Sequence, residues 1–213
     1  MVTPYYAVSL NLVNRKCLVV GGGRVAERKV KSLLDCNAEV IVVSPELSEG
    51  LRQLAEEGKI RHRAGEYTSE DLNGVFIVIS ATNSQELNRK VAIDCFARNI
   101  PINAVDDPEY CSFIVPAVVK RGDLSISIST GGKSPALARR IRQDLEQQYG
   151  NEYAILLEYL GQVRKDVLER IPGQEQREKI FRCLAENYLE LLELIKSQQE
   201  QLLEERVNQC LSL

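Results

Sequence analysis

The chain is poor in the residues that hold metals, cross membranes or bind nucleic acids. Among 213 residues there is one histidine, and the six cysteines are scattered with no Cys-x-x-Cys pair, which excludes the usual zinc and iron–sulfur layouts. No apolar run is long enough to cross a bilayer. The net charge of −3 leaves no basic excess to neutralise nucleic-acid phosphates. We therefore expect a globular protein whose partners are neither nucleic acid nor membrane, and no bound metal.

The cysteines and the first residues also bear on location. Residues 1–4 do not begin a basic segment followed by an apolar one, as a secretory leader would. We expect a cytoplasmic protein whose cysteines are reduced thiols that act as small apolar side chains. His62, the one histidine, lies in a short strand-like segment, where a solvated side chain is more typical than a catalytic one.

The most informative stretch is an apolar β-type run that ends in three glycines, over residues 17–26. It matches Gly-x-Gly-x-x-Ala, the turn on which dinucleotide pyrophosphates bind. Gly21 permits the tight turn, Gly23 lets the backbone approach the phosphates, and Ala26 allows close packing of helix on strand. The helix that follows directs its free N–H groups at the anion. A purely structural glycine turn is the alternative, and the flanking strand and helix patterns favour the dinucleotide.

Residues 6–106 alternate between strand-like and helix-like segments, and Asn83 is expected to begin the last helix. Such alternation predicts an α/β fold, a doubly wound parallel sheet of the Rossmann type. Strands are expected at residues 16–20, 39–44, 60–64, 75–80 and 101–105.

Ligands of such sheets bind beyond the carboxyl ends of the strands. Where dinucleotide folds usually carry an acidic residue for the ribose, this chain has Ser44 and Pro45, with Glu46 just beyond. No arginine suited to a 2′-phosphate is nearby, which favours NAD over NADP. The predicted ligand-binding edge comprises residues 21–25, 44–46, 81–83 and 106–107.

After residue 107 the pattern changes. Two β-type runs, residues 113–119 and 124–129, are joined through a Lys-Arg-Gly-Asp turn, which predicts a hairpin. A two-stranded ribbon is marginal alone, so we expect a second copy of the chain to cover it. The predicted domains are a dinucleotide-binding domain over 1–112, a dimerisation region over 113–149 and a helical domain over 150–213.

A glycine loop follows the hairpin and leads into a helix that ends near Tyr149. Ser134 is expected to cap this helix, and Pro135 fits its first turn. A triphosphatase loop is rejected because position 127, where its first glycine would fall, is serine. Free N–H groups at the start of the helix, with Lys133 and nearby arginines, suit an anionic ligand. A solvated, charged helix face is an equal alternative.

Several motifs together resemble the siroheme synthase family, the precorrin-2 dehydrogenases, many of which are also sirohydrochlorin ferrochelatases. The resemblance implies an NAD-binding domain, a central dimerisation region, a helical domain and a homodimer. The fused methyltransferase of some relatives is not expected, because the chain ends too soon. The resemblance covers roughly residues 5–145, and its motifs are residues 21–29, 80–83, 103–106, 112–117 and 129–139.

The resemblance also implies the chemistry. NAD⁺ takes a hydride from precorrin-2 to give sirohydrochlorin, and ferrous iron is a substrate if chelatase activity is present. Asp106 matches the family's catalytic aspartate. The polycarboxylate substrate is expected at Thr130, Gly131, Gly132, Lys133 and Ser134. The family's nucleotide contacts and the predicted sheet edge together give Gly21, Gly23, Arg24, Val25, Ser44, Pro45, Glu46, Thr82 and Asn83 as cofactor-binding residues.

The main alternative is a regulatory module that binds NAD and reports to a partner. It explains the first 106 residues equally well, but neither the hairpin around Pro116 nor the glycine loop with its basic helix. A small-substrate dehydrogenase is weakened by the lack of a second α/β domain. Judged from the neighbouring sequence alone, Asp106 could also have a structural role, as an aspartate in a turn or at a helix N-cap before Asp107 and Pro108.

Overall fold

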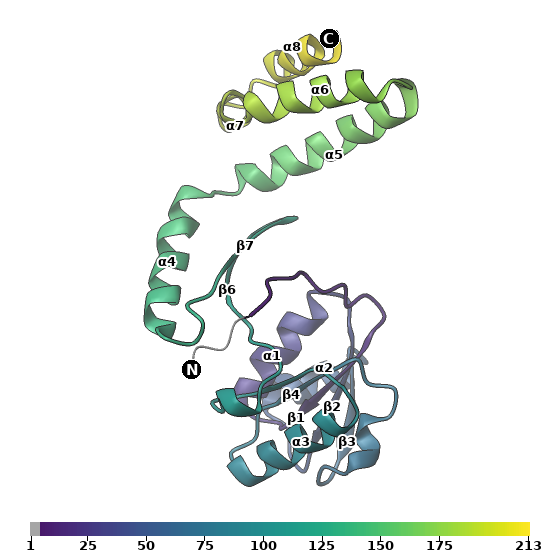
Figure 1. Ribbon diagram of the computed structural model, residues 1–213, viewed down its shortest axis with the longest axis vertical. Helices are drawn as coiled ribbons and strands as arrows, with labels where there is room; N and C mark the ends of the chain where they lie inside the picture. The colour runs from purple at the N-terminus through teal and green to yellow at the C-terminus, as the bar shows by residue number, and fades with distance from the viewer. Residues whose placement is uncertain (1–4) are drawn as a thin grey trace. The chain divides into compact units, whose positions relative to one another are not determined.

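The computed structural model of the chain describes residues 5–213 and falls into two compact units, with the division between Val115 and Pro116 (Figure 1). The expectation about a secretory leader concerns residues 1–4, which lie outside the described residues. Over residues 5–213, no helix combines the length and the apolar character that a membrane span needs.

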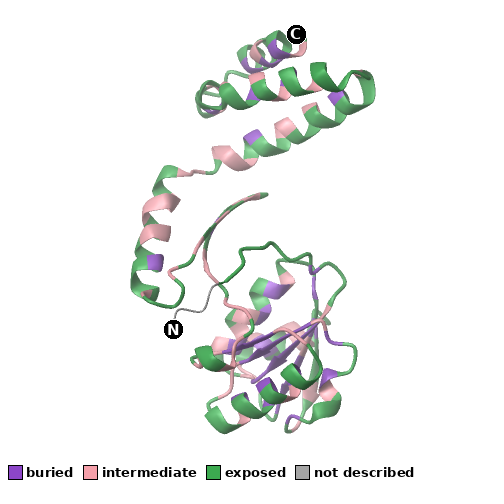
Figure 2. Cartoon of the chain, viewed as in Figure 1, coloured by how far each residue is buried: buried purple, intermediate pink, exposed green. Residues whose placement is uncertain are grey.

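The first unit contains a five-stranded sheet in which every strand pair is parallel, as predicted. Its order is β3-β2-β1-β4-β5. The central strand is wholly apolar after its first residue, and all of those apolar residues are buried, as Figure 2 shows by colour, because helices cover both faces of the strand. The strands are β1 (Lys16–Val20), β2 (Glu39–Ser44), β3 (Ile60–Ala64), β4 (Ile77–Ser80) and β5 (Ile102–Ala104).

Alternate residues of β1 point to opposite faces of the sheet. Cys17 and Val19 pack with helices α1 (Arg24–Leu34) and α2 (Glu49–Glu56). Leu18 and Val20 pack on the other face with α3 (Gln85–Ala97) and with η1 (Ser69–Leu72). A second 3₁₀ turn, η2 (Pro108–Tyr110), follows β5. The prediction of a doubly wound α/β fold is confirmed.

Several element boundaries differ from the sequence prediction. The strands expected at 75–80 and 101–105 are shorter, Ile77–Ser80 and Ile102–Ala104. The last helix of this unit begins one residue later than expected, because Ser84 caps it and its Oγ accepts a hydrogen bond from the Leu87 N–H at 3.2 Å. Asn83 therefore lies in the loop before the cap. The hairpin strand expected from residue 113 begins only at Ala117, because the N–H groups of Ser112 and Phe113 donate to the Ile102 carbonyl at the end of the first unit.

The second unit begins with the predicted hairpin, an antiparallel pair formed by β6 (Ala117–Arg121) and β7 (Leu124–Ile128). Gly122 turns it with a φ of +57°. Helix α4 (Pro135–Gln148) follows and is capped by Ser134, as predicted, with the Leu137 N–H donating to its Oγ at 3.3 Å.

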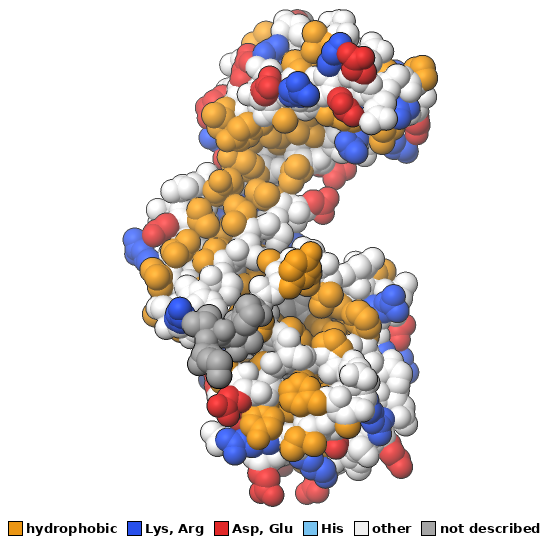
Figure 3. All heavy atoms as spheres, viewed as in Figure 1, with side chains coloured by type: hydrophobic (Ala, Val, Ile, Leu, Met, Phe, Trp, Pro, Cys, Tyr) orange, Lys and Arg blue, Asp and Glu red, His pale blue; other side chains and the backbone are white. Residues whose placement is uncertain are grey.

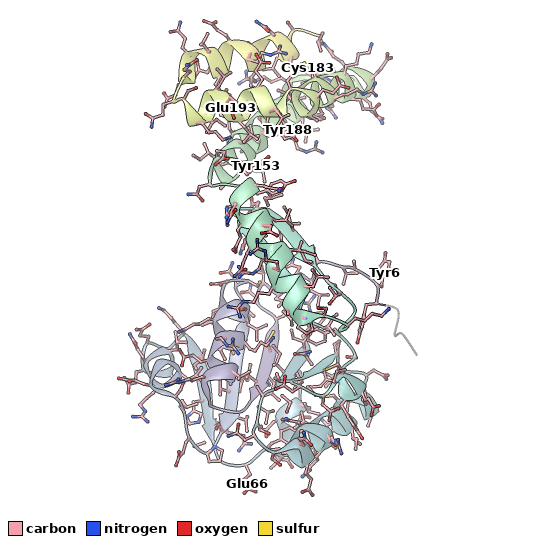
Figure 4. The ribbon with its side chains drawn as sticks, turned by 90° about the vertical axis from the view of Figure 1, so that its left-hand side faces the viewer. Tyr6, Glu66, Tyr153, Cys183, Tyr188 and Glu193 are labelled. Atoms are coloured by element: carbon pink, nitrogen blue, oxygen red, sulfur yellow. A yellow bond between two sulfur atoms is a disulfide. The ribbon has the colours of Figure 1, made fainter. Side chains whose placement is uncertain are left out.

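The rest of the second unit is helical and has its own apolar core. A disulfide joins Cys183 of α6 to Cys210 of α8 (Figure 4). The prediction of six reduced thiols is therefore wrong for these two, because the fold of the helices brings together residues that are 27 apart in the sequence. The helices are α5 (Glu152–Arg170), α6 (Gln174–Glu186), α7 (Tyr188–Lys196) and α8 (Glu200–Leu211).

The thiol pattern can be counted directly. In denaturant without reductant, a chromogenic thiol reagent should count four thiols, and six after reduction. In the folded chain Cys36 should react first because it is exposed. Burial raises the pKa of Cys17 to about 11 and that of Cys95 to about 12, which leaves both as unreactive thiols at neutral pH. Six reactive thiols in denaturant before reduction would contradict the disulfide.

Candidate active site

A cavity of about 1040 Å³ opens at the carboxyl edge of the parallel sheet, where ligands of such folds bind. Its walls come from the loops after β1, β2, β3 and β4 and from the first turns of α3. Of the nine predicted cofactor residues, all but Val25 line it; Val25 is half-buried on α1. The structure thus brings together residues from three separate loops, namely Gly21, Gly23, Arg24, Ser44, Pro45, Glu46, Thr82 and Asn83.

The three glycines after β1 have different structural roles. Gly21 has a φ of +118°, and a Cβ there would overlap the Ala81 carbonyl oxygen. A Cβ on Gly22 would overlap the carbonyl oxygen of Glu46, so this middle glycine is also required by the fold. Sequence reasoning missed this, because the close approach involves a loop far away in the sequence. A Cβ on Gly23 would have nothing within 4 Å, so the backbone there is open to a ligand.

Helix α1 begins beside this opening with its N-terminus uncapped. Gly23 occupies the cap position and offers no side chain, so the N–H groups of the first turn have no side-chain acceptor there. Together with the helix dipole they favour an anion at this point. Arg24, the first helical residue, is exposed and lines the cavity.

The loop after β2 is tied to the glycine turn by hydrogen bonds. The Ser48 N–H donates to the Gly22 carbonyl at 2.7 Å, and the Ser48 hydroxyl donates to Glu27 Oε2 at 2.7 Å. Hydrogen bonds from Lys31 and Ser48 lower the pKa of Glu27, so it stays ionised at neutral pH. Glu27 therefore links the first turn of α1 to the loop after β2, a role that no sequence signal indicated.

Two predicted cofactor residues at the end of β2, Ser44 and Glu46, differ in whether their side chains already have hydrogen-bond partners. The Ser44 hydroxyl donates to the Glu46 carbonyl at 2.6 Å and so is already engaged. Glu46 is exposed at the cavity wall, and within residues 5–213 no side chain forms a hydrogen bond or ion pair with its carboxylate. At the end of β2, the Glu46 carboxylate is thus left without a hydrogen-bond partner among the described residues, whereas the Ser44 hydroxyl has one.

The loop after β4 is fixed by a buried asparagine. Asn88, which is 4% exposed, accepts hydrogen bonds at its Oδ1 from the hydroxyls of Ser80 and Thr82 at 2.7 and 2.8 Å. Its Nδ2 donates to the Thr82 carbonyl at 3.2 Å. Asn88 thereby shapes the third wall of the cavity. Its only sequence signal is a polar residue at a helix position where an apolar one is usual.

Asp106 follows β5, the neighbour of β4 at the same sheet edge, but does not line the cavity. It is exposed, and its φ of +61° is a left-handed conformation. Its carboxylate has no hydrogen-bond or ion-pair partner among residues 5–213. Of the two structural alternatives for Asp106, the turn aspartate agrees with the structure, because Asp106 lies in the turn that the Asp107 N–H closes on the Ala104 carbonyl. The N-cap position of η2 is occupied by Asp107, whose side chain makes no capping hydrogen bond and pairs with Arg89 at 3.1 Å.

Lys29 of α1 is half-buried, and no sequence signal singled it out. Burial is the main cause that lowers the pKa of Lys29, and Arg28 adds to it. The charges of Cys111 and Asp106 act in the opposite direction, which places Lys29 within electrostatic range of both.

Replacing Lys29 with methionine should stabilise the protein by about 0.5–2 kcal/mol at neutral pH. Its lowered pKa means that the unfolded chain binds the lysine proton more tightly, so the stability of the parent rises as the pH rises through the folded pKa. The advantage of Lys29→Met should therefore shrink at alkaline pH, as measured by urea unfolding. The control Lys31→Met loses only an exposed pair with Glu27 and should not stabilise; equal gains for both variants would contradict this explanation.

The glycine loop of the second unit is ordered by its own hydroxyl groups. Thr130 Oγ1 accepts from the Ser134 N–H at 3.1 Å, and Gly131 and Gly132 have φ values of +59° and +79°. The Lys133 side chain is exposed. The described residues contain no group of three or more His, Cys, Asp or Glu side chains that could hold a metal ion.

Two family models match the chain. The first, described as putative NAD(P)-binding, covers residues 8–117, and the second, described as sirohaem biosynthesis protein central, covers residues 121–148. The first model alone matches more than half of the chain, and the two are adjacent.

Curated relatives and a solved structure agree with these models. Siroheme synthase of Methylobacillus flagellatus is 43% identical over 174 residues, which are 82% of this chain and 37% of that protein. Siroheme synthase of Nitrosomonas europaea is 40% identical over 174 residues, which are 81% and 37%. The chain therefore spans little more than a third of the length of these relatives.

The solved structure of SirC, a precorrin-2 dehydrogenase, superimposes with a TM-score of 0.74 at 29% identity. The match covers 98% of this chain and 100% of SirC, so both units have counterparts there. The cavity described above lies wholly within the region of the NAD(P)-binding model. The chain belongs to the siroheme synthase family.

Proposed function

We propose that the chain catalyses the NAD⁺-dependent oxidation of precorrin-2 to sirohydrochlorin. The observation that carries the proposal is the unpaired Asp106 carboxylate, which follows β5 at the sheet edge where the glycine turn and the cavity lie. The full-length likeness to a precorrin-2 dehydrogenase supports the same assignment.

The reaction removes a hydride and a proton from the macrocycle. When bound, the nicotinamide supplies the hydride acceptor. The uncapped N-terminus of α1 would hold the pyrophosphate, and the open backbone at Gly23 would let it approach. The hydride leaves a carbon of the macrocycle with the C–H bond electrons, and Asp106 accepts the proton that the macrocycle then loses. Its carboxylate suits this role because it is engaged with no other side chain among the described residues. The same carboxylate is suited to accept pyrrole protons displaced by ferrous iron as a second substrate.

The substrate is a polycarboxylate, and we assign its acidic groups to the glycine loop over residues 130–134. The exposed Lys133 side chain and the start of α4 supply positive charge there. Alanine at Lys133 should raise the KM for precorrin-2 without changing the affinity for NAD⁺, which isothermal titration calorimetry measures separately.

One purified sample tests the function. NADH formation from NAD⁺ and precorrin-2, followed by absorbance, tests the dehydrogenase. Uptake of ferrous iron into added sirohydrochlorin, measured without NAD⁺, tests the chelatase. A chain that binds NAD⁺ in calorimetry but forms no NADH with precorrin-2 would favour the regulatory module instead.

We further propose that the cofactor is NAD⁺ rather than NADP⁺, because the free Glu46 carboxylate would repel a 2′-phosphate. Replacing Glu46 with glutamine should lower the preference for NAD⁺ about tenfold, the effect of removing roughly 1.4 kcal/mol of charge repulsion. Glu49→Gln is the control, since Glu49 is exposed on α2 but does not line the cavity. The ratio of kcat/KM for the two cofactors is the measurement, and an unchanged ratio in Glu46→Gln would contradict the assignment.

A homodimer is the third part of the proposal. In the second unit, apolar side chains of the hairpin and of the two following helices remain exposed, and Figure 3 shows apolar side chains gathered over α4 and α5. A contiguous apolar surface of this kind marks an interface. Sedimentation equilibrium should give twice the chain mass of 24.0 kDa, and a monomer at micromolar concentration would refute it. The exposed residues include Val118, Leu137, Ile155 and Leu157.

A further inference from the structure

The turn that carries Asp106 has an unusual backbone. It runs from Ala104 to Asp107 and is closed by the Asp107 N–H, which donates to the Ala104 carbonyl at 3.3 Å. Asp106 lies inside it with a φ of +61°. This conformation is uncommon for a non-glycine residue, although aspartate adopts it more readily than most, and contacts around the turn fix the direction of its side chain. The geometry of the proposed catalytic carboxylate therefore depends on what braces the turn.

The thiol of Cys111 lies against both ends of this turn. Its Sγ is 3.1 Å from the Ala104 carbonyl oxygen and 3.4 Å from that of Asp107, and it is the donor to both. It also accepts from Asn103 Nδ2 at 3.5 Å. Cys111 is half-buried, and that burial raises its pKa. The group therefore stays a neutral S–H donor at neutral pH.

The neighbouring side chains of Arg89 and Ser112 bond to other groups than the carbonyls of the turn. Arg89 pairs with the carboxylate of Asp107 and not with the backbone of the turn. Two backbone bonds also reach the turn, from the Val105 N–H to the Ser80 carbonyl at 2.9 Å and from the Tyr110 N–H to the Asp107 carbonyl at 3.1 Å. The Ser112 hydroxyl accepts from the Ile102 N–H at 2.8 Å and so fixes the chain against β5. Among the described residues, Cys111 is the one whose side chain bonds to the carbonyls on both sides of Asp106.

We propose that Cys111 is a positioning residue, whose thiol holds the Ala104–Asp107 turn so that the Asp106 carboxylate is presented to the substrate. This inference rests on the proposed dehydrogenase function. Cys111 contacts neither cofactor nor substrate in this assignment, and it acts only through the backbone of the turn. Loss of the thiol should slow proton removal while leaving the cofactor cavity unchanged, since Cys111 does not line that cavity.

Three variants separate hydrogen bonding from packing. Cys111→Val fills the site with a somewhat larger side chain that has no polar atom, Cys111→Ala removes both the thiol and its volume, and Cys111→Ser keeps a donor. Valine and alanine should lower kcat about ten- to hundredfold, the cost of misplacing a reacting group by a fraction of an ångström to one ångström. Serine should retain activity within about threefold of the parent, because a hydroxyl restores the donor. The dissociation constant for NAD⁺, measured by calorimetry, should be unchanged in all three.

The outcomes are distinct. Full activity of Cys111→Val would overturn the proposal, as would equal losses in the serine and valine variants, since both mean that the donor is irrelevant. A weaker NAD⁺ affinity alongside the lower kcat would indicate general disruption of the unit and would also overturn it. The parent and Asp106→Asn are assayed together with them. A parent that forms no NADH refutes the proposed function, whereas an active parent with an active Cys111→Val refutes only the role of Cys111.

Discussion

Replacing Asp106 with asparagine should lower the rate of NADH formation from precorrin-2 about 10²- to 10⁴-fold, the usual contribution of a positioned base. Asparagine is the informative replacement because, like aspartate, it tolerates the left-handed backbone found at this residue. Alanine there would add backbone strain of about 1–2 kcal/mol and would confuse misfolding with lost chemistry. Single-turnover absorbance measurements with saturating NAD⁺ give the rate.

Asp107→Asn is the matched control. Asp107 is the next residue and is also an aspartate, but its carboxylate is held by Arg89. Its loss should cost stability and leave most of the turnover. Binding of NAD⁺ to Asp106→Asn should be unaltered. A rate for Asp106→Asn within about threefold of the parent, far below the contribution of a base, would remove Asp106 from the mechanism.

Substituting alanine at Gly23 should abolish cofactor binding in a chain that still folds normally. The backbone there has a φ of −86°, which alanine accepts, and a Cβ meets no protein atom within 4 Å. The unfolding free energy should therefore stay within about 0.5 kcal/mol of the parent. The added methyl group occupies the space through which the backbone approaches a pyrophosphate, so we expect the affinity for NAD⁺ to fall about 100-fold or more, a loss of about 2.7 kcal/mol.

Alanine at Gly21 should have the opposite profile. Its Cβ would overlap the Ala81 carbonyl oxygen at a backbone φ of +118°, so we expect a loss of about 3–5 kcal/mol in stability. Urea unfolding and calorimetric titration with NAD⁺ on the same preparations separate the two effects. If Gly23→Ala bound NAD⁺ as tightly as the parent, the pyrophosphate would have to lie elsewhere and the whole cofactor assignment would be wrong.

The backbone of the first unit could be predicted because its signals are local. An apolar run such as Val40 to Val43 is typical of a buried parallel strand, and the alternation with helices fixes the direction of every strand. The glycine turn and the Ser134 cap are likewise set by neighbouring residues. These features need no knowledge of what lies across the fold.

The support of the site depends on contacts between distant parts of the chain. Gly22 is required because Glu46 approaches it, and Glu27 matters because Ser48 donates to it. Nothing in the spacing of Cys183 and Cys210 indicates that α6 and α8 bring them together. Such contacts follow from tertiary packing, so they cannot be predicted from the local patterns of a single sequence.

The close approach between Gly22 and Glu46 has a kinetic consequence. No space remains between the glycine turn and the loop after β2, and the Ser48 N–H bonds across them. The loops after β1 and β2 therefore form a binding site that is already in place before the cofactor arrives, and we expect them not to move independently. Capture of the dinucleotide should then be limited by diffusional encounter and orientation, with no slow rearrangement in its association kinetics.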